Sequence, residues 1–199
     1  MTSSIESQRF SVNAIEDGWW QKALKLPSPN FNTRPPGSEV SLLVIHNISL
    51  PPGGFGGGYV EAFFLNKLNP SDHPYFEAIA EVEVSAHCFI DRHGHVTQFV
   101  SFDDRAWHAG RSAFNGEQEC NDFGIGIELE GTDSLEYTVE QYTSLVELSA
   151  VLLNKYPKLT LDRIVGHCDI APERKTDPGE AFDWQNYKSE LAKRLQERD

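Results

Sequence analysis

The sequence predicts a single α/β domain, because short apolar runs typical of strands occur together with longer amphipathic runs typical of helices. Residues 41–45 (SLLVI) are rich in branched side chains, as expected of a buried central strand. Residues 124–129 (GIGIEL) alternate between two faces, and residues 138–156 carry an apolar stripe with helical spacing. Because 199 residues are enough to form one hydrophobic core, a second domain is not required.

The composition is that of a globular protein, with 39% hydrophobic and 24% charged residues, which excludes a disordered chain or a fibre. A formal net charge of -13 repels phosphate groups, so we expect no binding to nucleic acid or to an anionic membrane. Residues 1–18 lack the apolar core of a signal peptide. Cys88, Cys120 and Cys168 cannot all pair within the chain, and reduced thiols in a cytoplasmic protein are the expectation.

The first 40 residues are predicted to be an irregular arm packed on the body, because four prolines between positions 27 and 36 interrupt regular helix. The domain proper is expected at 41–199. Residues 51–58 (PPGGFGGG) form a flexible loop that lacks the Lys-Ser/Thr of a phosphate-binding loop. A helix is predicted over 59–68 and a hairpin over 84–100.

Two strands and two helices are predicted in the rest of the chain. Residues 124–129 place the isoleucines on one face and Glu128 with two glycines on the other. Thr138 and Gln141 form the capping box that begins the helix 138–156. A short strand at 163–166 ends at His167, an irregular Pro-rich segment follows, and Asp183 caps a final amphipathic helix.

Histidines at strand ends are the strongest chemical signal. The chain has no GxSxG or HExxH motif and no recognised cysteine nucleophile motif. Histidines combined with loop carboxylates are the ligands of a catalytic zinc. His46 and His167 both follow apolar strands, although a buried neutral histidine is the alternative for each. His73, His93 and His95 lie in predicted loops or turns, where solvent exposure is expected.

Five blocks, in family order, resemble the AmpD family of cytoplasmic 1,6-anhydro-N-acetylmuramoyl-L-alanine amidases. They are VIHNISLPPG (44–53), VSAHCFID (84–91), RAWHAG (105–110), CNDFGIGIELEGTD (120–133) and GHCDIAPERKTDPG (166–179). The resemblance extends from about Pro27 to Trp184, and the pattern is more distantly similar to phage-type zinc amidases and peptidoglycan recognition proteins. It implies a mixed central sheet flanked by helices.

The resemblance also implies a site and a reaction. His46, His167 and Asp177 are implied to bind Zn²⁺, Glu128 to act as the general base, and Lys175 to assist at the developing oxyanion. The reaction is hydrolysis of the amide between (1,6-anhydro-)N-acetylmuramic acid and L-alanine of muropeptides, in cell-wall recycling. Two imidazoles and a carboxylate suit a zinc ion that activates water.

Four further residues are candidates to line a sugar or peptide pocket, because aromatic and amide groups combine apolar contact with directed hydrogen bonds. They are Asn47, His87, Trp107 and His108. Packing is the alternative for each of them, a paired sheet carboxylate is the alternative for Glu128, and a solvated loop charge is the alternative for Lys175.

The chain departs from the family pattern at Glu83 and Glu119, where relatives tend to carry arginine. These departures leave the preference for stem-peptide length open. Two rival functions also remain: a muropeptide-binding module that recognises without cutting, and an exported autolysin or phage lysin that acts on intact wall. The sequence does not identify a protein partner.

Overall fold

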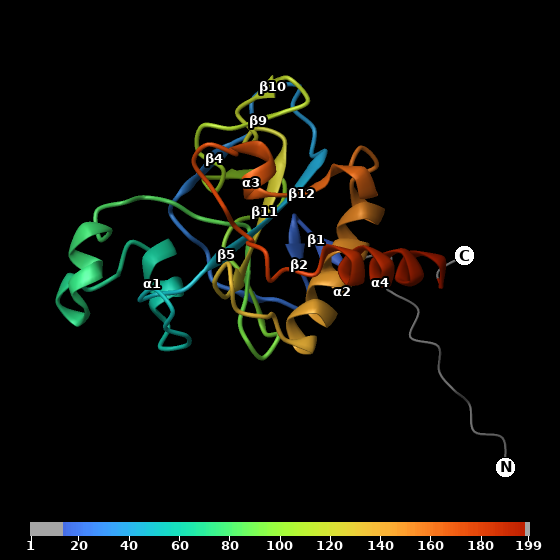
Figure 1. The fold of residues 1–199 in the computed structure, drawn as a ribbon. Helices are drawn as coiled ribbons and strands as arrows, with labels where there is room; N and C mark the ends of the chain where they lie inside the picture. The colour runs from blue at the N-terminus through green and yellow to red at the C-terminus, as the bar shows by residue number, and fades with distance from the viewer. Residues whose placement is uncertain (1–13, 198–199) are drawn as a thin grey trace, which may run out of the picture.

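The computed structural model describes residues 14–197. Its centre is a six-stranded sheet with the strand order β12-β5-β11-β6-β7-β3 (Figure 1). Neighbouring strands are parallel except for the antiparallel pair β6 and β7, so the expected mixed sheet is confirmed. The strands are β3 (Leu24–Lys25), β5 (Leu42–Ile48), β6 (Cys88–Ile90), β7 (Val96–Gln98), β11 (Gly124–Glu130) and β12 (Ile164–Gly166).

One face of the sheet is covered by α2 (Val139–Lys155) and α4 (Trp184–Gln196), on the right in Figure 1. Leu43 and Ile45 of β5 pack in the same core cluster as the apolar side chains of both helices. Thr138 forms the predicted capping box, and the Asp183 side chain accepts a hydrogen bond from the Asn186 N–H. Both predicted helices are confirmed.

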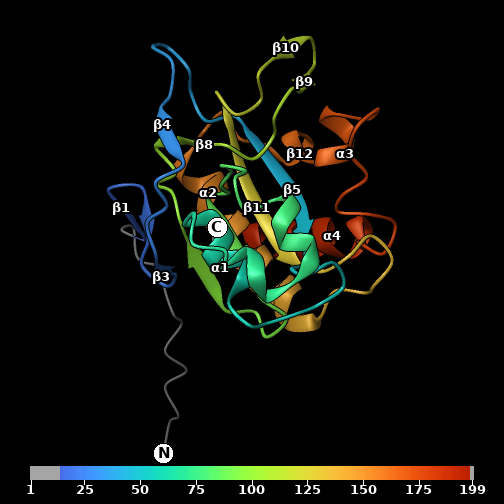
Figure 2. The same cartoon turned by 90° about the vertical axis from the view of Figure 1, so that its left-hand side faces the viewer.

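The other face carries a lobe formed by residues 59–84, which contains α1 (Tyr59–Phe64) and the 3-10 turns η1 (Pro70–Asp72) and η2 (Pro74–Ala78) (Figure 2). The helix predicted over 59–68 ends early. Asn66 has a φ of 57°, which lies in the left-handed region that an α-helix does not use. The lobe lies on the side of the sheet opposite α2 and α4, on the left in Figure 1, and Phe64 of α1 packs edge to face against Phe99, which follows β7.

Residues 1–13 of the predicted irregular arm lie outside the described residues, and residues 14–40 are irregular between short strands. Four short strands occur there: β1 (Ile15–Glu16), β2 (Trp19–Trp20), β3 and β4 (Phe31–Thr33). β3 adds an edge strand to the sheet through β7, and β4 pairs with β8 (Asp104–Ala106). Strands of two or three residues are too short to show periodicity. β1 and β2 pair with each other, whereas the partners of β3 and β4 are distant in sequence.

The hairpin predicted over 84–100 is confirmed as β6 and β7, but both strands are shorter than expected. Small two-stranded hairpins are also formed by β9 (Ala113–Phe114) with β10 (Glu117–Gln118) and by β1 with β2. β5 continues past Ile45, so His46 lies inside the strand. After β12 the chain forms one helical turn, α3 (His167–Ile170), where irregular structure was predicted. Within residues 14–197, no helix has the length and apolar character needed to span a bilayer.

Candidate metal and catalytic site

The parallel register of β5 and β11 places His46 directly beside Glu128. Both side chains point away from α2 and α4, because the preceding residues, Ile45 and Ile127, pack in the core on the helix-covered face. β12 pairs with the other edge of β5 and delivers His167, its next residue, to the same face. The adjacent strands β12, β5 and β11 thus bring His167, His46 and Glu128 together.

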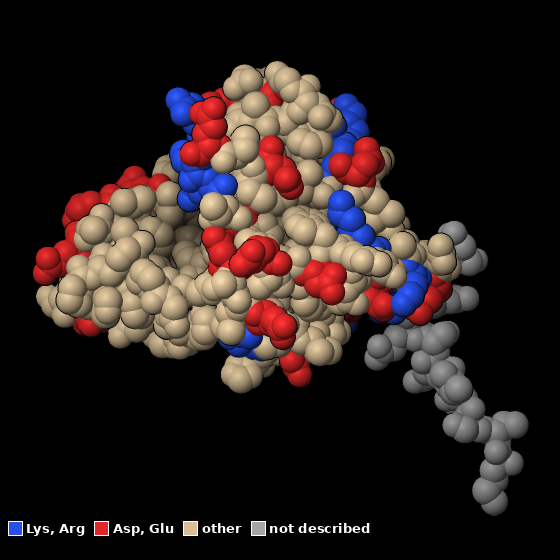
Figure 3. Space-filling view, in the orientation of Figure 1, with Lys and Arg blue, Asp and Glu red and all other residues tan. Residues whose placement is uncertain are grey.

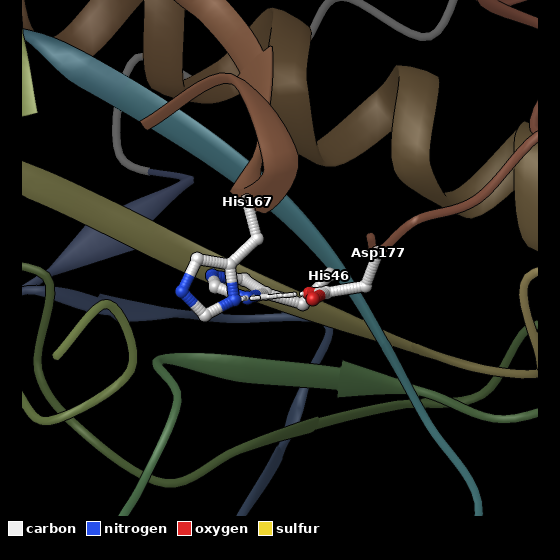
Figure 4. Close-up of side chains that lie close together, drawn as sticks. All are labelled: His46, His167 and Asp177. Carbon is white, nitrogen blue, oxygen red and sulfur yellow. Dashed lines mark hydrogen bonds and ion pairs between the residues drawn. The ribbon is translucent and has the colours of Figure 1, made fainter. Parts of the chain in front are cut away.

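Asp177 reaches the two histidines from the loop after α3. Its Oδ2 lies 3.1 Å from the Nδ1 atoms of both His46 and His167, and those two nitrogens lie 2.9 Å apart (Figure 4). The Nε2 of His167 lies 3.0 Å from the carbonyl oxygen of Ala109, to which only an N–H can donate. In the neutral ring, Nδ1 of His167 therefore presents a lone pair to the carboxylate.

Burial and hydrogen bonds act in opposite directions on the pKa values of His46 and Asp177. Burial lowers the pKa of His46 to about 4, against the opposing effect of its hydrogen bond with Asp177. For Asp177, burial opposes ionisation, but the hydrogen bonds to His167 and His46 hold the pKa of its carboxyl well below the ordinary range. Neutral imidazole and ionised carboxylate are the forms that ligate metals.

The geometry of the cluster fits a metal ion. Within residues 14–197, the ligand atoms of His46, His167 and Asp177 all lie within 4.8 Å of one another. Three ligands about 2 Å from a tetrahedral ion are separated by roughly 3.3 Å, close to the spacing found here. A set of two imidazoles and one carboxylate is typical of catalytic sites that keep a fourth position for water or substrate.

A cavity of about 430 Å³ opens at this cluster. It lies between the body and the 59–84 lobe, where Figure 3 shows a hollow. The body side supplies most of the polar lining residues and the lobe side is mainly apolar, a combination expected of a ligand pocket. Lining residues on the body include Asn47, Trp107, His108, Glu128, His167, Lys175 and Asp177, and those on the lobe include Phe63, Phe64, Tyr75, Ile79, Val82 and Val84.

Glu128 has the surroundings of a proton acceptor. Its side chain lines the cavity, and its Oε2 is buried without a hydrogen-bond partner among the residues that the structure describes. Burial raises the pKa of Glu128 well above its ordinary value, the charge of Asp177 adds to this effect, and Lys175 opposes it. A carboxylate held in this way gains strongly from accepting a proton.

Three of the four residues predicted to line a pocket lie at the cavity, and His87 does not. Asn47 and Trp107 reach the cavity, and the indole N–H of Trp107 donates to Asn32 Oδ1 at 2.7 Å. His108 borders the cavity but is mostly buried. The expectation for His87 is corrected, because its ring is fully buried, its Nδ1 accepts from the Gly126 N–H, and its Nε2 contacts the carbonyl oxygen of Asp104.

Asp133 is not among the predicted site residues, yet it links the segment that carries His46 to the segment that carries Asp177. Its carboxylate accepts hydrogen bonds from Asn47 Nδ2 at 2.8 Å and from Thr176 Oγ1 at 2.5 Å. A Cβ on Gly179, whose φ is 82°, would lie 2.1 Å from the Asp133 Cα, so this approach requires glycine. Asp133 stands in one of the family blocks, but its partners are far away in sequence and no local pattern reveals them.

Comparison by sequence finds amidases that are similar to this chain. A family model described as N-acetylmuramoyl-L-alanine amidase matches residues 36–180. The 1,6-anhydro-N-acetylmuramyl-L-alanine amidase AmpD of Haemophilus influenzae is 56% identical over 180 residues, which cover 90% of this chain and 98% of the relative.

Solved structures also match. A crystal structure of a selenomethionine derivative of AmpD has a TM-score of 0.86 and 51% identity, covering 88% of this chain and 98% of that one. The amidase AmiD of Escherichia coli, in complex with the substrate anhydro-N-acetylmuramic acid-L-Ala-D-gamma-Glu-L-Lys, has a TM-score of 0.57 and 26% identity. That match covers 79% of this chain and 60% of AmiD.

Proposed function

We propose that this chain, which belongs to the N-acetylmuramoyl-L-alanine amidase family, uses zinc held by His46, His167 and Asp177 to cleave muropeptides. The chain is a hydrolase of the amide bond between N-acetylmuramic acid and L-alanine. Its substrate is a soluble muropeptide bearing the 1,6-anhydro sugar, produced in peptidoglycan recycling. The observation that carries the proposal is the convergence of three ligand atoms beside Glu128, at a cavity that Glu128, His167 and Asp177 line.

A zinc ion in this cluster would supply Lewis acidity, which polarises the scissile carbonyl and lowers the pKa of water. Glu128 is the general base: its Oε2 accepts a proton from the attacking water and returns it to the departing nitrogen. Lys175 borders the same cavity, and its ammonium group stabilises negative charge on the carbonyl oxygen. The C–N bond breaks to leave the muramic carboxylate and a stem peptide with a free amine.

The two walls of the cavity, one on the body and one on the lobe, orient the substrate. Asn47 and Trp107 are the proposed polar and aromatic contacts on the body. Tyr75 and Val82, with 42% and 43% of their surface exposed, present the apolar wall of the lobe. An apolar wall opposite a polar one suits a ligand that has both a sugar ring and an amide-bearing chain.

We place the enzyme in the cytoplasm, where thiols stay reduced. Cys88 and Cys120 are buried, Cys168 is partly buried, and all three are free. We therefore expect three thiols to react with an alkylating reagent in the denatured protein without prior reduction, as counted by mass spectrometry. Finding only one reactive thiol would indicate a disulfide and contradict this location.

The proposed function is tested by incubating the zinc-loaded protein with a soluble anhydro-muropeptide and, separately, with insoluble sacculi. We expect the soluble substrate to be split into anhydro-N-acetylmuramic acid and stem peptide, with loss of activity after chelation and recovery on adding zinc. Faster release from sacculi would favour the autolysin or lysin alternative. Unchanged activity in the chelated, metal-free protein would contradict the zinc assignment.

A further inference from the structure

We propose that His108 is a positioning residue for the metal site, whose Nδ1 accepts a hydrogen bond from the Nε2–H of His46. This inference rests on the proposed zinc site and replaces the substrate contact expected for His108. The two nitrogen atoms lie 2.9 Å apart, and the two rings meet edge to face with their centroids 5.0 Å apart. Both rings are buried, so solvent does not supply another acceptor for His46.

The role follows from a competition for one proton on His46. A neutral imidazole carries its proton on either Nδ1 or Nε2. Asp177 Oδ2, 3.1 Å from Nδ1, attracts the proton to the atom that must ligate the metal. His108 Nδ1 offers an acceptor at the opposite nitrogen. With the proton on Nε2, the Nδ1 lone pair of His46 faces the cluster.

The neighbouring residue performs the same task for the second histidine. The carbonyl oxygen of Ala109 accepts the Nε2–H of His167 at 3.0 Å, and it also accepts from Arg174 at 2.6 Å. Consecutive residues of one segment therefore hold the outer nitrogens of both histidine ligands. Supporting hydrogen bonds of this kind fix the tautomer and the ring orientation of metal-bound histidines.

The fold holds His108 in place from two directions. The backbone N–H groups of His108 and Ala109 both donate to Asn121 Oδ1, at 3.1 and 2.8 Å. The imidazole ring packs against Gly126 of β11, where a Cβ would come within 2.4 Å of the His108 Cγ. The ring thus occupies space that the glycine leaves free.

The second nitrogen of His108 supports a role beyond packing. Its Nε2 is buried, and no hydrogen-bond partner for it exists among residues 14–197. A buried polar atom without a partner costs folding free energy, so a purely structural ring at this position would be better as an apolar one. An imidazole is explained if its other nitrogen is needed as an acceptor for His46.

Two variants separate the acceptor from the ring. His108→Phe keeps a ring over Gly126 but removes the acceptor, whereas His108→Asn loses the ring and keeps an oxygen near the position of Nδ1. Zinc affinity is measured by competition with a chromophoric chelator, on metal-free proteins whose folding is checked by circular dichroism and melting temperature. We expect affinity to fall by roughly 10–100-fold in His108→Phe, the usual effect of removing such a support, and to change by only a few-fold in His108→Asn.

A measurement on the unaltered protein covers the case in which a variant does not fold. In zinc-loaded protein labelled with ¹⁵N-histidine, NMR should show His46 protonated at Nε2 and His108 unprotonated at Nδ1. A proton on His108 Nδ1 would overturn the proposal, as would wild-type affinity in His108→Phe or equal losses in both variants. If Asp177→Ala also leaves zinc affinity unchanged, the zinc site itself is wrong, and that failure is distinct from failure of the His108 role.

Discussion

Glu128→Gln is expected to slow amide hydrolysis by roughly 10²–10⁴-fold, the usual contribution of a general base. The amide side chain keeps the size and shape of the carboxylate but cannot take a proton from water. Because Glu128 is not one of the three clustered ligand residues, the variant should still bind one zinc and the muropeptide. Single-turnover release of the stem peptide, with zinc content and melting temperature measured on the same preparation, tests the role.

Glu130→Gln is the matched control, since Glu130 lies on the same strand two residues further on. Its carboxylate accepts hydrogen bonds from the N–H groups of Gly56 and Arg92, so it supports a loop and a turn. We expect Glu130→Gln to lower the melting temperature while the rate per folded molecule stays near wild type. If Glu128→Gln shows this same behaviour, Glu128 is a structural carboxylate and the base lies elsewhere.

The parts of the fold that the sequence predicted correctly are those with strong local periodicity. The alternation in residues 124–129 put Glu128 on the face opposite the core isoleucines, and the structure has it there. The capping box at Thr138 also marked the start of α2 correctly. In both cases the pattern lies within a few consecutive residues, so no tertiary information was needed.

The parts that were missed depend on contacts between residues far apart in the chain. The Leu26 N–H donates to the Gln98 carbonyl, and this distant pairing, rather than any local pattern, accompanies the edge strand β3. The apolar side chains of the 59–84 lobe could not be told from core residues until the structure placed a cavity beside them. His87 shows the converse error, since a histidine next to family motifs is here a buried hydrogen-bonding residue.

The two departures from the family pattern lie on the surface. Glu83 and Glu119 are exposed, and Glu119 Oε2 lies 3.8 Å from Arg105 Nη2 at the surface. Neither residue lines the 430 Å³ cavity. The departures therefore leave the metal cluster and Glu128 unchanged, and any effect on substrate preference would act on parts of the stem peptide beyond the scissile bond.

Asp177→Ala is expected to weaken zinc binding by more than the roughly 10–100-fold loss that follows removal of a supporting residue around a metal site. The carboxylate supplies the negative charge of the cluster and contacts both histidines at 3.1 Å. Without it, two neutral imidazoles remain, and a site with two protein ligands falls short of the three that hold a catalytic zinc. Hydrolysis should fall with the zinc content.

The matched control is Glu173→Ala, which removes one negative charge from an exposed position on the same loop. Zinc per protein is measured by elemental analysis after dialysis, and affinity is measured by chelator competition, with circular dichroism to check the fold. We expect about one zinc in the wild type and in Glu173→Ala and almost none in Asp177→Ala. One tightly held zinc in a folded Asp177→Ala protein would remove Asp177 from the ligand set, because an alanine side chain has no atom that can ligate a metal.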